Sequence, residues 1–83
     1  MSKRVSPIYR GLLQHGEVVY FYFLLRPDGR VQPFGLIFES EEEESRYSSS
    51  DPGYEDAPIP WDLLAEIQEV EILTEVMEEA EQE

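Results

Sequence analysis

The chain has 83 residues, of which 19 are Asp or Glu against six Lys or Arg, and its formal net charge is −13. This length allows one small domain, which buries only about 60–65% of its unfolded surface. The sequence has no cysteine, which excludes disulfides and thiolate-bound zinc. A charge of this sign repels nucleic acid and anionic lipid and attracts basic proteins. We therefore expect a single acidic domain over residues 1–83.

Residues 5–14 (VSPIYRGLLQ) predict a first strand that is bulged or lies at an edge. Pro7 has no amide donor and Gly11 weakens a strand interior, and both features are typical of such strands. His15 and Gly16 follow and predict a two-residue hairpin turn, because glycine readily adopts the positive φ that this turn requires.

Residues 18–25 (VVYFYFLL) form the longest uncharged apolar run and predict the central strand. The run is rich in β-branched and aromatic residues, which favour strands, and it is far shorter than the roughly 20 residues that span a bilayer. Alternation places Phe21 and Phe23 on one face and Tyr20 and Tyr22 on the other. We expect the tyrosine face to be the wetter one.

Residues 26–29 (RPDG) predict a type I turn with a bulge, in which the proline presets φ, the aspartate caps the turn and the glycine is left-handed. Residues 30–39 predict a third strand, at an edge or bulged because it contains Pro33 and Gly35. Its alternate apolar residues, which we expect on the Phe21 side, are Phe34, Leu36 and Phe38. The stretch 5–39 thus predicts an antiparallel meander.

Residues 40–59 are rich in acidic residues and serine, which predicts a long, exposed acidic loop. A loop of this length without structure of its own is unusual in a compact domain and is often functional. We expect Tyr47, Tyr54 and Ile59 to anchor parts of it.

Residues 60–83 begin with a proline, which suits the first turn of a helix. Two interpretations of the segment remain open. In one, a short helix over 60–67 precedes a fourth strand over 69–76 and a frayed acidic tail. In the other, a single amphipathic helix runs to about Glu81 and covers the phenylalanine face. The predicted fold class is α+β: a three- to four-stranded antiparallel meander with one C-terminal helix and a long acidic loop.

The sequence offers little for catalysis. The only histidine, His15, falls at a turn tip without an identifiable partner, and the five glycines do not form a phosphate-binding loop. The consecutive acids of 41–44 lack the alternating spacing and glycine hinge of a calcium loop. We therefore predict no enzymatic activity, no metal site and no cofactor.

Protein binding remains, and the acidic half of the chain is its best candidate. Ordered carboxylates can occupy the positions where a basic groove expects phosphates. We predict a small module that binds, and inhibits, a basic nucleic-acid-binding protein by mimicking nucleic acid. The predicted partner-binding residues are Glu39, Glu41, Glu42, Glu43, Glu44, Asp51, Glu55, Asp56, Asp62, Glu66 and Glu69, together with Tyr20 and Tyr22 of the central strand.

Two alternative functions depend on the sheet rather than on the negative charge. In the first, an accessory or structural subunit docks through a sheet edge or the tyrosine face, or pairs two copies as a homodimer. In the second, the aromatic residues stack on single-stranded nucleic acid. The charge argues against direct nucleic-acid or membrane contact, and the N-terminal residues lack the apolar core of a secretory signal. We expect a cytoplasmic protein.

Overall fold

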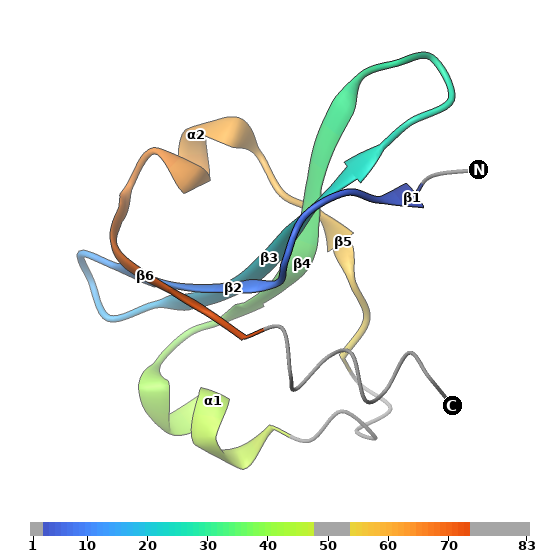
Figure 1. Cartoon of the computed structure of the whole chain (residues 1–83). Helices are drawn as coiled ribbons and strands as arrows, with labels where there is room; N and C mark the ends of the chain where they lie inside the picture. The colour runs from blue at the N-terminus through green and yellow to red at the C-terminus, as the bar shows by residue number, and fades with distance from the viewer. Residues whose placement is uncertain (1–2, 48–53, 74–83) are drawn as a thin grey trace.

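The computed structural model describes residues 3–47 and 54–73, which form an antiparallel sheet of six strands with two short helices (Figure 1). The α+β class and the antiparallel sheet are confirmed, whereas the predicted number of three to four strands is wrong. The elements in chain order are β1 (Lys3–Arg4), β2 (Tyr9–Leu13), β3 (Val18–Leu25), β4 (Val31–Phe38), α1 (Glu41–Arg46), β5 (Ala57–Pro58), α2 (Trp61–Leu64) and β6 (Ile67–Ile72).

The strand order is β5-β4-β3-β2-β6, with β1 pairing β3 beyond the end of β2. The central strand has the predicted bounds, and the meander of β2, β3 and β4 is in the predicted order. The prediction that β2 and β4 are edge strands is only partly correct. β6 covers the outer side of β2, while the two-residue β5 covers only Phe34 and Gly35 of β4.

Pro7 interrupts the first strand. β1 and β2 both pair with β3, but two extra residues lie on their side between the last β1 pair and the first β2 pair. The Ser6 hydroxyl oxygen lies in this interval and accepts a hydrogen bond from the Phe23 amide at 2.9 Å. The predicted bulge is therefore present, and a side chain satisfies the amide of β3 that the bulge would otherwise leave unpaired.

The first hairpin is one residue longer than predicted. The Gly16 amide donates to the Leu13 carbonyl at 3.1 Å, so Gln14 and His15 are the central residues of the turn. Gly16 follows them with φ +91°, as expected for the left-handed position of a bulged loop. The glycine conformation was thus predicted correctly and the loop length was not.

The second hairpin has the predicted geometry. The Gly29 amide donates to the Arg26 carbonyl at 2.9 Å, and Gly29 has φ +88°. The Asp28 carboxylate accepts from the Arg30 amide at 3.0 Å. This is the type I turn with a left-handed glycine that the RPDG segment predicts.

The sheet is buried on both faces. One core contains Leu13, Val19, Phe21 and Ile59, and the other contains Val18, Leu36 and Phe38. The prediction that the tyrosine face of β3 is the more exposed one is only partly correct. Tyr20 and Tyr22 are half-buried and Phe21 on the other face is buried. At the ends of the strand, however, Val18 on the tyrosine face is fully buried and Leu25 on the phenylalanine face is exposed.

The predicted facing of β4 is wrong. Leu25 pairs with Val31 across the second hairpin, and this register places Leu36 opposite Tyr20. Directly opposed residues share a face. Phe34, Leu36 and Phe38 therefore join the tyrosine side of β3, not the phenylalanine side.

A helix forms in the segment predicted to be a loop. Ser40 caps α1, because its hydroxyl accepts from the Glu43 amide at 3.2 Å, and the Glu43 carboxylate accepts from the Glu39 amide at 2.7 Å. These reciprocal bonds resemble a capping box and satisfy amides that have no partner inside the helix. Tyr47, which follows α1, and Tyr54 pack on Phe38, with ring centroids 5.2 and 5.6 Å from it.

The prediction of one C-terminal helix is wrong. α2 is a single turn that ends at Leu64, and the chain then continues as β6, which pairs with β2. Of the two interpretations left open, the short helix followed by a strand holds over the described residues, with the strand beginning at Ile67 instead of 69. Pairing with β2 outweighs the helical preference of the glutamates, because it satisfies the outer backbone groups of that strand. The predicted frayed tail lies outside the described residues.

Candidate functional site

Arg10 joins three parts of the fold in one cluster of charges. It projects from β2, and its guanidinium donates twice to Glu44 of α1, from Nε to Oε2 at 2.6 Å and from Nη2 to Oε1 at 2.8 Å. Its Nη1 donates to Glu71 of β6 at 3.3 Å, and Glu41 of α1 lies 3.5 Å from Nη2. A two-pronged arginine–carboxylate pair of this kind fixes orientation as well as distance.

Tyr20 completes the cluster from β3. Its hydroxyl donates to Glu44 Oε2 at 2.6 Å. The hydrogen bonds from Arg10 hold the pKa of Glu44 below its usual range, while burial and the bond to Glu44 raise the pKa of Tyr20. The same carboxylate raises the pKa of Arg10. Glu44 is therefore an ionised, internally satisfied anchor that ties α1 to the sheet.

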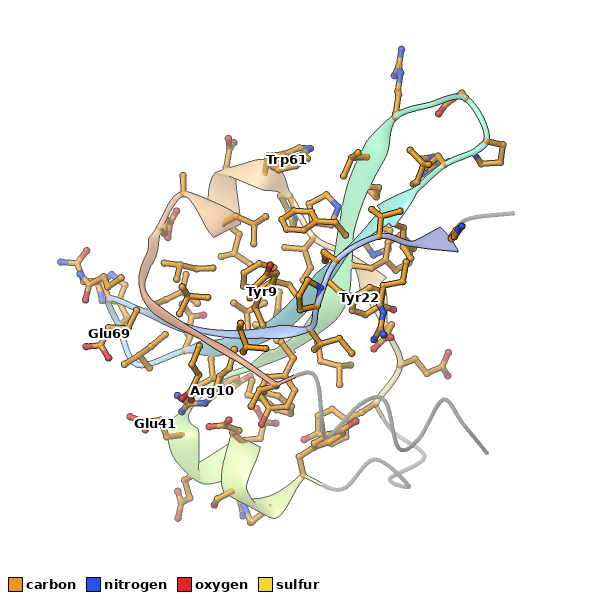
Figure 2. The ribbon with its side chains drawn as sticks, in the orientation of Figure 1. Tyr9, Arg10, Tyr22, Glu41, Trp61 and Glu69 are labelled. Carbon is orange, nitrogen blue, oxygen red and sulfur yellow. The ribbon has the colours of Figure 1, made fainter. Side chains whose placement is uncertain are left out.

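Around this anchor lie three carboxylates that face solvent, which we call the acidic rim: Glu41, Glu69 and Glu71. The side chains of Glu41 and Glu71 are 64% and 62% exposed. Glu69, Val70 and Glu71 line a surface depression of about 190 Å³ together with Arg10. Figure 2 shows Arg10, Glu41 and Glu69 close together where β6 passes α1. The single positive charge of Arg10 therefore lies among several carboxylates, so the net charge of this surface is negative.

The remaining predicted residues are dispersed. The carboxylate of Glu43 is occupied by the Glu39 amide and the Tyr54 hydroxyl, and that of Asp56 accepts from the Tyr22 hydroxyl. Five further predicted residues are exposed and lie outside the Arg10 cluster: Glu39, Glu42, Glu55, Asp62 and Glu66. Asp51 lies outside the described residues. The structure thus brings Glu41, Glu44 and Glu69 together with Tyr20; whether any of these residues binds a partner stays a prediction.

Two members of the cluster, Arg10 and Glu71, were not among the predicted site residues. The three-residue loop of the first hairpin sets Arg10 opposite Tyr20, which places both on one face. The predicted two-residue loop would have set Arg10 opposite Phe21, so the contact could not be found without the correct loop length. Glu71 could be found only by pairing β6 with β2, which sets it opposite Arg10. That contact depends on a long-range strand pairing that the local pattern does not specify.

A second exposed feature is aromatic and lies on the other side of the sheet. The Trp61 ring stacks on Phe23 with centroids 5.8 Å apart and ring planes inclined by 21°, and Trp61 is 55% exposed. Leu63 and Leu64 of α2 pack against the core that contains Phe21, whereas Tyr47, next to α1, packs on the opposite core. Figure 2 shows Trp61 well separated from Arg10, Glu41 and Glu69.

His15 is exposed in the first hairpin loop. Among residues 3–47 and 54–73, no group of three or more His, Cys, Asp or Glu side chains is arranged to hold a metal ion. No helix in the described part of the chain is long and apolar enough to cross a membrane.

A scan against protein-family models, a search of curated proteins and a search of solved structures each give no match. The chemistry of the site must therefore be inferred from its own geometry.

Proposed function

We propose that the chain is an acidic protein-binding module that docks on a basic, nucleic-acid-binding protein and covers its nucleic-acid surface. The observation that carries this proposal is the convergence of carboxylates from α1 and β6 on one surface around Arg10. α1 is capped and ion-paired and β6 is part of the sheet. Carboxylates on such elements are held in place before binding, which lowers the entropy cost of association.

The charge of the whole chain supports the same proposal. A net charge of −13 on 83 residues steers a basic partner from a distance and speeds encounter. The acidic rim then supplies exposed anions where the partner's groove would hold phosphates. Because these anions face solvent, we expect the interaction to weaken as salt is added.

The alternative of base stacking on single-stranded nucleic acid has less support from the tyrosine face of β3. The Tyr20 ring packs edge-on against Phe38 and Tyr47, with centroids 5.0 and 6.1 Å away, and its hydroxyl is held by Glu44. A base-stacking platform needs an exposed flat ring. We assign Tyr20 to holding α1 in place, and the rim would in addition repel phosphates within a Debye length of about 8 Å at physiological salt.

Affinity capture from the native host followed by binding measurements on the purified partner tests the proposal. We expect the affinity to fall with rising salt, and the chain to displace nucleic acid from that partner. Glu41→Gln and Glu69→Gln should each weaken binding about twofold to fivefold, the effect of losing one exposed ion pair.

Asp28→Asn is the matched control. It removes the same charge in the hairpin loop before β4, and its amide oxygen can still accept from the Arg30 amide. We expect binding by this variant to equal that of the wild type. An affinity that is independent of salt, or equal losses for Asp28→Asn and Glu69→Gln, would show that the acidic rim is not the docking surface.

A further inference from the structure

The last strand of the sheet has an outer edge that no other described strand covers. β6 pairs with β2 and is the terminal strand in the order of the sheet. Its residues Val70 and Ile72 are 58% and 64% exposed, which is more than any other large hydrophobic residue in the described chain. Open edges of this kind are templates for pairing with another chain.

The register shows which backbone groups face outward. The Leu73 amide donates to the Ile8 carbonyl, so residues 8 and 73 occupy a hydrogen-bonded position of the ladder between the two strands. In an antiparallel ladder, hydrogen-bonded pairs alternate with pairs that are not hydrogen-bonded. The backbone N–H and C=O groups of Glu71 and Glu69 therefore point towards β2. The backbone amides and carbonyls of Val70 and Ile72 therefore point to the open edge.

The side chains along this edge alternate in chemistry. Val70 and Ile72 share one face, while Glu69 and Glu71 share the other, next to Arg10. A second copy of β6 paired antiparallel would set glutamates against glutamates on the same face, which is unfavourable. A strand that alternates apolar and basic residues would instead match both faces.

We propose that the outer edge of β6 takes up an extended basic segment of the partner as an added strand. Its apolar residues lie beside Val70 and Ile72, and its Lys or Arg residues lie beside Glu69 and Glu71. Main-chain hydrogen bonds supply affinity in this mode, and the alternating side chains supply specificity. The inference rests on the proposed function and adds to it the chemical form of the segment that is bound.

The experiment removes one outward amide without changing charge. Val70→Pro deletes the Val70 N–H, and proline is tolerated where a strand's N–H faces solvent. Val70→Thr is the control, because it is β-branched and keeps the amide. The probe is the capped peptide acetyl-(Lys-Val)3-amide, with acetyl-(Glu-Val)3-amide as its charge control, and binding is followed by NMR titration. Circular dichroism establishes that each variant is folded.

We expect the lysine peptide to bind the wild type and Val70→Thr with equal affinity, and Val70→Pro at least tenfold more weakly. The glutamate peptide should not bind. Amide exchange at Val70 and Ile72 should slow when the lysine peptide is added. If Val70→Pro does not fold, a lysine peptide with N-methyl groups on alternate backbone amides tests the same hydrogen bonds on the wild-type chain and should bind at least tenfold more weakly.

Three results would overturn the inference. Equal binding to Val70→Pro and Val70→Thr, with salt dependence retained, would leave the acidic rim as the docking surface and exclude strand addition. Slow exchange of both outward amides in the free monomer would mean that the edge is already covered by the chain itself. A dimer in sedimentation equilibrium that Val70→Pro dissociates would assign the edge to a second copy. Loss of salt dependence in the wild type would instead count against the proposed function.

Discussion

Replacing Glu44 by glutamine tests the anchor that holds α1 on the sheet. The side chains of Arg10 and Glu44 are only 21% and 12% exposed, and Glu44 accepts two hydrogen bonds from Arg10 and one from Tyr20. A hydrogen bond to a charged group contributes about 1.5–3 kcal/mol. Glutamine keeps one acceptor oxygen, and Arg10 keeps Glu41 and Glu71, so we expect a net loss of about 2–3 kcal/mol.

That loss is large for a domain of this size. At about 0.05–0.15 kcal/mol per residue, the free energy of unfolding of the 83-residue chain is roughly 4–12 kcal/mol. The melting temperature should fall by about 10–20 °C. Urea denaturation followed by circular dichroism measures the change in stability. Glu42→Gln is the control, because it removes the same charge from an exposed position in the same turn of α1 and should cost less than about 0.5 kcal/mol.

The pH dependence gives a second readout. The pKa of Glu44 is lowered in the folded chain, so its contribution is complete above the unfolded value of about 4.3 and is lost as pH falls through the folded value. The stability gap between the wild type and Glu44→Gln should therefore narrow between pH 6 and pH 3. Equal stability of the Glu44→Gln and Glu42→Gln variants, or a gap that is the same at both pH values, would refute the anchoring role.

Three further substitutions test the packing of the sheet and the cap of α1. Gly35→Ala should cost more than about 3 kcal/mol in urea denaturation, because the added Cβ would clash with the Tyr20 carbonyl across the two strands; a stable variant would contradict this close approach. Ile59→Ala should cost about 2–5 kcal/mol, since Ile59 is fully buried, and a loss below 1 kcal/mol would exclude its place in the core. Ser40→Ala should cost about 1 kcal/mol through loss of the α1 cap, measured by thermal melting against Ser45→Ala.

The parts of the fold that were predicted correctly depend on local chemistry. The central strand follows from an unbroken β-branched and aromatic run, and the RPDG turn follows from residues that each favour one position of that turn. The turn also contains the information that corrects the facing of β4. A left-handed glycine at position 29 sets Leu25 opposite Val31, and this register alone assigns Leu36 to the tyrosine side.

The sequence contains a local signal for the helix α1. A serine followed three residues later by a glutamate is the capping-box pattern, and Ser40 and Glu43 make that contact. β6 is different, because its glutamates favour helix and its alternation favours strand in equal measure. Pairing with the edge of β2 that no other described strand covers decides between them. The same pairing determines the contact of Glu71 with Arg10. That part of the candidate site could not be derived before the fold was known.

No residue of α1 is buried, although the helix contributes Glu41 to the acidic rim. Six residues are too few to form a stable helix alone, so α1 depends on its cap and on the ion pair with Arg10. The ion pair weakens in acid as Glu44 is protonated, whereas the apolar cores of the sheet do not lose their driving force there. Acidification below the usual glutamate pKa of about 4.3 should thus release α1 while β3 and its neighbours remain paired. The position of Glu41 in the acidic rim would then depend on pH before the sheet itself unfolds.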